Sequence, residues 1–344
     1  MSCALRSSDS VIRYNRPALE HDDTCMTRPA LPDWTAPELT VTAAAPPWFH
    51  SALSWPVTSH FVTVEDCPIH YLRWATAPDR APRRGVLLVH GGGAHANWWR
   101  FIAPFLAADY AVAALDLSGM GDSGRRAEYD ARQRSAEMRA VCEDADLGPA
   151  PFVVGHSFGG YMTMRLAALH GKELGGVVIV DSPIRPPEEA EDATPRRVLN
   201  LERHYPSFEI AVERFRLLPA QDCTNDFLVE FIARHSVCRS DTGWTWKFHV
   251  GAMGARRWEE PFAEHLVNMR CRRALLYGAE SALVSRRTAA HMAGLLGPET
   301  PVVEIPEARH HVMLDQPLAF VAALRTLFDI WVRSTPGASC AGDA

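Results

Sequence analysis

The sequence predicts an α/β fold: a mostly parallel sheet flanked by helices, with a helical segment inserted into it. Short apolar runs alternate with helix-like segments, which is the pattern of a parallel sheet covered on both faces. One of these runs, 152–154, passes through a glycine-rich turn directly into a helix-like segment. The alternation stops near residue 183 and resumes near residue 263, which indicates an insertion.

Each element of the sheet follows from its local pattern. Alternating apolar residues at 60–64 and 69–74 predict an antiparallel hairpin at the sheet edge. Continuous apolar runs predict buried strands, and apolar residues at helical spacing predict helices. We expect strands at 85–90, 110–116, 152–154, 174–181, 273–278 and 301–305, and helices at 97–106, 138–145, 161–169 and 317–331.

The length of 344 residues suits one large domain with an insertion. Residues 1–50 are rich in proline and lack periodicity, so we interpret them as a flexible N-terminal leader. Residues 51–182 and 263–344 form the predicted α/β core. We predict that residues 183–262 form a helical cap over the carboxyl ends of the strands, where such sheets bind ligands. The alternative is a helical decoration with no part in substrate choice.

Charge and composition exclude several classes of partner. The formal charge is -6 and the chain has only two lysines, so it carries no basic patch for nucleic acid or for an anionic membrane. No signal-peptide core and no apolar run of about 18 residues appears. The eight cysteines lack C-x-x-C spacing, as expected of reduced thiols. We therefore expect a cytoplasmic protein without membrane insertion, and a homo-oligomer is compatible with the sequence.

The turn Gly155-His-Ser157-Phe-Gly159 has the Gly-x-Ser-x-Gly pattern between a strand and a helix. In a nucleophile elbow of this kind, a strained turn holds the serine hydroxyl clear of the sheet. Ser157 is therefore the candidate nucleophile, and an ordinary turn serine is the alternative. Serine needs a base to remove its proton. Two adjacent histidines follow the last strand. His310 is the candidate base; His311 begins an apolar run and is expected to pack or support, and it is the alternative base.

The acid that would orient this base is ambiguous. An aspartate is usual three or four residues beyond Gly278, but Ser281 and Ala282 occupy those places. Asp181 ends the preceding strand, and Glu280 lies one residue short of the usual place but has a longer side chain. Either carboxylate could hold the imidazole tautomer, and a water or a neutral group is the third alternative. Asp181 could also merely cap a turn.

A glycine loop, His90-Gly-Gly-Gly93, closes a strand and is the candidate oxyanion hole. Its expected donors are the backbone N–H groups of Gly92 and Phe158, with Gly93 as an alternative to Gly92 and a merely flexible turn as the other interpretation. Aromatic residues could line an apolar pocket or simply belong to the core. They are Trp98, Tyr161, Trp244 and Trp246.

No cofactor or metal is expected from local motifs. Gly119-Met-Gly121-Asp-Ser-Gly124 matches a dinucleotide fingerprint in form only, because a polar stretch follows it rather than a helix. The histidines other than His310 and His311 show no H-E-x-x-H or facial-triad spacing, so no metal site is indicated.

Together, the elbow, the His-Gly-Gly-Gly loop, the 116–123 loop and the 308–317 segment resemble the α/β-hydrolase superfamily over about residues 55–333. The resemblance implies a serine hydrolase that cleaves a small-molecule ester or lactone with an apolar moiety. The alternatives are a hydrolase of carbon–carbon bonds next to a ketone and a non-catalytic ligand-binding member. Some members carry their acid at the end of the strand before the cap, as Asp181 would.

Overall fold

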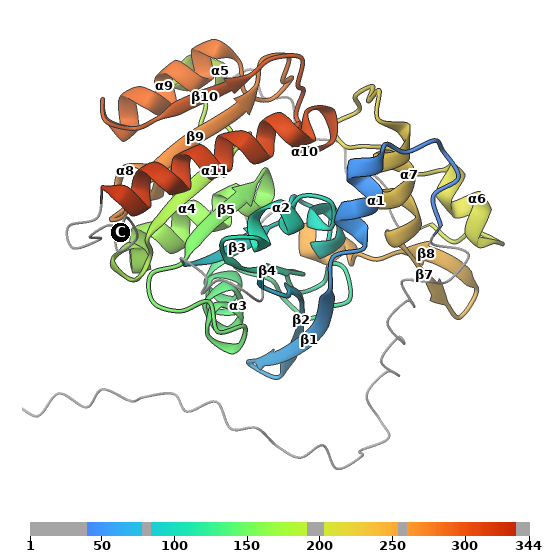
Figure 1. Cartoon of the computed structure of the whole chain (residues 1–344). Coiled ribbons are helices and arrows are strands. Elements are labelled where there is room, and N and C mark those ends of the chain that lie inside the picture. Colours follow the sequence, from blue (N-terminus) through green and yellow to red (C-terminus); the bar gives the residue numbers. More distant parts are fainter. Residues whose placement is uncertain (1–39, 78–83, 191–202, 254–259, 335–344) are drawn as a thin grey trace, which may run out of the picture. The chain divides into compact units, whose positions relative to one another are not determined.

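An eight-stranded sheet forms the centre of the protein, seen in a computed structural model that describes residues 40–77, 84–190, 203–253 and 260–334 (Figure 1). Its strands follow the spatial order β1-β2-β4-β3-β5-β6-β9-β10. They are β1 (Val57–Val64), β2 (Cys67–Trp74), β3 (Gly85–Val89), β4 (Ala111–Leu115), β5 (Phe152–His156), β6 (Gly176–Val180), β9 (Arg273–Gly278) and β10 (Val302–Ile305).

The predicted hairpin at the sheet edge is confirmed. β1 pairs only with β2 and runs antiparallel to it, with Val64 opposite Cys67. The two residues between them, Glu65 and Asp66, both have positive φ, as the twist of a tight two-residue hairpin requires. β2 is antiparallel to β4, and all further pairs are parallel. The mostly parallel sheet is thus confirmed.

Helices cover both faces of the sheet. They are α1 (Pro47–Leu53), α2 (Ala103–Ala107), α3 (Ala131–Asp144), α4 (Phe158–His170), α8 (Phe262–Val267), α9 (Arg286–Leu296), α10 (Val312–Asp315) and α11 (Pro317–Arg333), with the 3₁₀ turns η2 (Ala96–Trp99) and η3 (Gly171–Glu173). Among the described helices, none has the length and apolar character that crossing a bilayer requires.

Alternate side chains of the strands feed two separate hydrophobic cores. In β3, Val86 and Leu88 pack into the core shared with α2 and α11, whereas Leu87 and Val89 pack into the core shared with α3, α4 and α9. Successive side chains of a strand point to opposite faces, so a strand buried on both sides reads as an unbroken apolar run. This is why the runs could be recognised in the sequence.

Two expectations need correction. The helix predicted over 97–106 is broken into η2 and α2, because Pro104 lacks the N–H that a continuous helix needs and instead occupies the first turn of α2. The end of the predicted leader is ordered: α1 begins at Pro47, and Phe49 is fully buried against Phe101 and Phe231. Residues 1–39 of the predicted leader lie outside the described residues.

The segment between β6 and β9 departs from the strand–helix alternation, and we call residues 183–262 the inserted segment. Its elements are α5 (Pro187–Ala190), α6 (Phe208–Glu213), α7 (Asp226–His235), β7 (Val237–Ser240), β8 (Gly243–Trp246) and η4 (Val250–Met253). Two of its helices, α6 and α7, lie together beside a small antiparallel hairpin, whereas α5 lies next to α9 (Figure 1). The hairpin corrects the expectation of a helical segment, because alternating Trp244 and Trp246 reflect strand periodicity.

Candidate functional site

The candidate residues converge at the carboxyl ends of the parallel strands. His90 follows β3, Ser157 follows β5 and Asp181 follows β6, while His310 comes from the loop after β10. Because β3, β5, β6 and β10 are parallel strands of one sheet, their carboxyl ends lie at the same edge. Residues far apart in the sequence are thereby gathered at one place.

Ser157 occupies a strained turn. Its φ of 51° and ψ of -115° lie outside the regions that ordinary residues adopt, and α4 begins at the next residue. The turn is held from both sides: the Ser157 N–H donates to the Val180 carbonyl at 2.9 Å, and its carbonyl accepts from Ser182 Oγ at 2.8 Å. These hydrogen bonds fix the turn through the backbone of Ser157 and do not involve its side-chain hydroxyl.

The glycines beside Ser157 are required by close packing. A Cβ on Gly159 would lie 2.5 Å from the His90 carbonyl oxygen, and a Cβ on Gly155 would lie 2.5 Å from the Gly159 carbonyl oxygen. Gly91 approaches the turn from the neighbouring loop, where a Cβ would lie 3.3 Å from that of Ser157. Helix, strand and glycine loop therefore meet closer than side chains would permit.

Asp181 and His310 form a buried pair. His310 Nδ1 lies 2.7 Å from Asp181 Oδ1, and the two side chains are 2% and 0% exposed. Asp181 also accepts from the Gly278 N–H at 3.1 Å and from Ser281 Oγ at 2.7 Å. A carboxylate with these three contacts holds the imidazole ring in one orientation with Nδ1 protonated.

Glu280 does not reach this pair. Its carboxylate is half exposed and lies 3.4 Å from Arg309 Nη2. Ser281, which stands where an aspartate was expected, instead donates to Asp181 and accepts from the Leu283 and Val284 N–H groups. The serine that replaces the expected aspartate thus provides a hydroxyl that holds the Asp181 carboxylate.

His90 fixes the glycine loop. Its Nδ1 donates to the Gly91 carbonyl at 2.7 Å, and its Nε2 accepts from the Leu117 N–H at 3.0 Å. Burial lowers the pKa of His90, which keeps the ring in the neutral form that these two bonds require. Among the described residues, none accepts a hydrogen bond from the Gly92 N–H. Phe158, the other expected donor, begins α4 and is 4% exposed.

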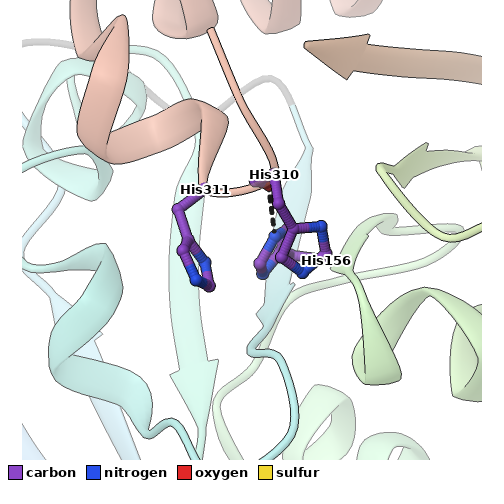
Figure 2. A group of neighbouring side chains, drawn as sticks. All are labelled: His156, His310 and His311. Atoms are coloured by element: carbon purple, nitrogen blue, oxygen red, sulfur yellow. Dashed lines mark hydrogen bonds between the residues drawn. The ribbon is translucent and has the colours of Figure 1, made fainter. Parts of the chain in front are cut away.

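Two further histidines surround His310 (Figure 2). The ring centroids of His156 and His311 each lie 4.8 Å from that of His310. His156 Nε2 donates to the His310 carbonyl at 3.0 Å and so ties the Ser157 turn to the His310 loop (Figure 2). Burial, followed by the neighbouring His310, lowers the pKa values of His156 and His311 well below the usual range, so both rings are neutral at pH 7.

The inserted segment holds the histidine loop. Gln221 Oε1 accepts from the His311 N–H at 3.0 Å, and its Nε2 donates to both oxygens of Asp315. Asn225 Nδ2 donates to the Leu314 carbonyl at 2.7 Å. These contacts couple the position of the loop to the inserted segment, which local sequence patterns do not reveal.

Of the four predicted pocket aromatics, Trp98 packs beside the histidines. The Trp98 ring centroid is 5.1 Å from that of His311, and the side chain is 7% exposed. Tyr161 donates to the Pro183 carbonyl at 2.8 Å and packs against Phe262. Trp244 packs against Phe208, and Trp246 packs against Tyr205 and Phe215. In the described structure, these last two belong to the small core of the inserted segment.

The glycine-rich loop after β4 is held by Asp116. Asp116 Oδ2 lies 2.7 Å from His70 Nδ1 and accepts from the Asp122 N–H, while Oδ1 accepts from the Ala96 N–H. Although burial acts to raise it, the charge and hydrogen bond of His70 lower the pKa of Asp116. A Cβ on Gly121 would overlap this carboxylate. Gly121 therefore serves packing around Asp116, while Gly119 leaves room for Tyr129 and Gly124 for Pro68.

The buried neutral histidines predict acid sensitivity. Burial lowers the pKa of His235 to about 3, against the opposing hydrogen bond to the Phe231 carbonyl. Below pH 6.5 the unfolded chain binds a proton that the folded chain refuses, so stability falls as pH drops from 6.5 towards 3, by about 1.4 kcal/mol per pH unit for one such group. Denaturant unfolding at pH 7.5, 6 and 5 checks this. His235→Phe should show a shallower pH slope, and an unchanged slope would contradict the assignment.

The chain is similar to a known protein family and to two esterases. The family model of the alpha/beta hydrolase family matches residues 86–324. Esterase Rv0045c of Mycobacterium tuberculosis is 29% identical over 276 residues, covering 76% of this chain and 86% of the relative. A pimeloyl-[acyl-carrier protein] methyl ester esterase of Edwardsiella ictaluri is 27% identical, covering 71% of this chain and 93% of the relative. Both of these relatives are named as esterases.

Other comparisons give a shorter match and two similar structures. A 2-hydroxy-6-oxo-6-(2'-aminophenyl)hexa-2,4-dienoic acid hydrolase of Metapseudomonas resinovorans is 31% identical, but over only 32% of this chain and 39% of the relative. The crystal structure of E-2-(acetamidomethylene)succinate hydrolase has a TM-score of 0.68 at 21% identity, covering 80% of this chain and 100% of that one. That of esterase Rv0045c has a TM-score of 0.62 at 24% identity, covering 82% and 95%. With its parallel sheet, its elbow and a family match over most of the core, the chain belongs to the alpha/beta hydrolase family.

Proposed function

We propose that this chain is a serine hydrolase that cleaves a carboxylic ester or lactone with an apolar moiety through an acyl-enzyme intermediate. The observation that carries the proposal is the buried contact of 2.7 Å between His310 Nδ1 and Asp181 Oδ1 next to a strained Ser157 turn. This contact leaves Nε2 of His310 to accept a proton.

In the proposed mechanism, Ser157 Oγ attacks the carbonyl carbon as His310 Nε2 takes the hydroxyl proton. Asp181 keeps the ring oriented and stabilises the imidazolium, with Ser281 and the Gly278 N–H holding the carboxylate in place. The Gly92 and Phe158 N–H groups bind the oxyanion. His310 then protonates the leaving alcohol, and water releases the acyl group by the same steps.

The substrate class is supported by the surroundings of the histidines. The large apolar ring of Trp98 is buried beside His311. An apolar acyl or alcohol part fits such surroundings better than a charged one, because a buried charge needs a partner. The inserted segment, which contacts the histidine loop through Gln221, acts as a cap in this proposal.

Hydrolysis of a carbon–carbon bond next to a ketone is the second candidate, favoured by the name of the partial relative from Metapseudomonas resinovorans. Product analysis separates the two. We expect p-nitrophenyl butyrate and a matched lactone to be turned over, and a dienol ketone to remain intact. Cleavage of the ketone with no turnover of any ester would replace the proposal with the second candidate.

A further inference from the structure

Three imidazoles gather at the end of β5 and in the loop after β10, and hydrolysis as proposed uses only one of them. One ring nitrogen from each of His156, His310 and His311 lies within 4.8 Å of the other two. The three residues are 1%, 2% and 4% exposed, respectively. A buried group of three neighbouring imidazoles calls for an explanation beyond packing, since each ring nitrogen is a polar atom that burial penalises.

Lone pairs remain available in this cluster. Neither ring nitrogen of His311 has a hydrogen-bond partner of normal geometry among the described residues, while the nearby Leu218 backbone acts to raise the pKa of His311 against the larger effect of burial. His310 Nδ1 is hydrogen-bonded to Asp181, so the lone pair on Nε2 takes no part in that interaction. His156 donates a hydrogen bond from Nε2 to the His310 carbonyl. Metal binding through Nε2 would replace this hydrogen bond, whereas metal binding through Nδ1 would retain it.

We propose that His156, His310 and His311 form a binding site for a transition-metal dication such as Zn²⁺, and that metal bound there blocks hydrolysis by occupying His310. Neutral imidazoles are the ligands that such ions prefer, whereas Mg²⁺ and Ca²⁺ prefer oxygen. Asp181 on Nδ1 of His310 completes the carboxylate–histidine–metal arrangement that is common around bound zinc.

The geometry requires a modest closure. In a tetrahedral zinc site with bonds of about 2.0–2.1 Å, the ligand nitrogens lie about 3.4 Å apart. Since the three nitrogens lie within 4.8 Å of one another, they must approach by up to about 1.5 Å. His311 is the ring that can turn, because no hydrogen bond in the described structure holds its nitrogens.

The second acidic and histidine-containing cluster lacks this character. His70, Asp116 and Asp122 also lie close together. Their ligand atoms are already engaged, however: His70 binds Asp116 and Ser59, Asp116 accepts backbone N–H groups, and Asp122 pairs with Lys247 at 2.8 Å. A metal there would have to displace a buried ion pair, so the inference is confined to the three histidines.

Binding can be measured without the reaction. We expect Co²⁺ added to chelator-treated Ser157→Ala protein to give the visible absorption of a one-to-one site, and Zn²⁺ to displace it. X-ray absorption of zinc-loaded wild type should show three imidazole nitrogens at about 2.0–2.1 Å. Absence of one-to-one binding, or a coordination sphere without three imidazoles, would overturn the site. The blocking effect alone rests on the proposed function, so binding by a protein that hydrolyses no ester would still support the site.

Inhibition is tested with p-nitrophenyl butyrate in wild type, His311→Phe and His50→Gln. The phenylalanine keeps the ring packing against Trp98 and removes the ligand, while His50 is an exposed control on α1. We expect Zn²⁺ to inhibit wild type and His50→Gln alike, His311→Phe to need at least about tenfold more Zn²⁺ for half inhibition, and Mg²⁺ to have no effect. Equal sensitivity of His311→Phe and wild type would overturn the proposal.

Discussion

Ser157→Ala is expected to lower kcat for p-nitrophenyl butyrate by at least about a thousandfold, because the hydroxyl is the atom that forms the acyl-enzyme. The fold should survive, since the strained turn is held by the backbone bonds of Ser157 to Val180 and Ser182, which alanine retains. Steady-state kinetics on purified protein, with thermal unfolding as the check on folding, measures the effect.

The matched control for this change is Ser51→Ala, which removes an exposed hydroxyl on α1. It should leave kcat within about twofold of wild type, as surface substitutions normally do. A Ser157→Ala protein that retained half of the wild-type rate would end the assignment of Ser157 as the nucleophile.

The second large effect distinguishes the two carboxylates. Asp181→Asn should lower kcat by about ten-thousandfold, because an amide beside Nδ1 favours the wrong tautomer of His310 while leaving the packing nearly unchanged. Glu280→Gln makes the same chemical change on a half-exposed side chain that faces Arg309, and should stay within about twofold of wild type.

These two variants are each other's control, since each replaces one carboxylate oxygen by an amide nitrogen. Their kcat values, measured side by side at saturating ester, decide which carboxylate orients His310. Equal and mild losses would mean that neither carboxylate orients His310, and the reverse order would transfer the role to Glu280.

Local patterns predicted the sheet well because its strands are buried on both faces. The continuous apolar run at 85–90 predicted a buried strand. The structure explains the run, because alternate side chains of this strand pack into two different apolar cores. The elbow could also be predicted from the sequence, because close packing requires glycine at positions 155 and 159. The prediction of a continuous helix over 97–106 failed because it considered apolar spacing alone. It did not take into account that Pro104 interrupts a helix.

Contacts between distant segments could not be predicted in this way. The choice between Asp181 and Glu280 depends on which carboxylate faces a ring 129 residues beyond Asp181, and sequence spacing gives no measure of that distance. Ser281 offered a faint signal, because a hydroxyl stood where an acid was expected. His156 offered none: it is the variable residue of the elbow pattern, and its neighbours His310 and His311 are brought to it by the fold.

The central claim is that Ser157 is activated by His310, and covalent labelling tests it most directly. A fluorophosphonate forms an oxygen–phosphorus bond with an activated serine and releases fluoride, so the modified peptide identifies the nucleophile. We predict one adduct on the peptide that carries Ser157, formed at least about a hundredfold more slowly in His310→Ala. An adduct on a different serine, or a labelling rate at Ser157 that is unchanged in His310→Ala, would contradict the account.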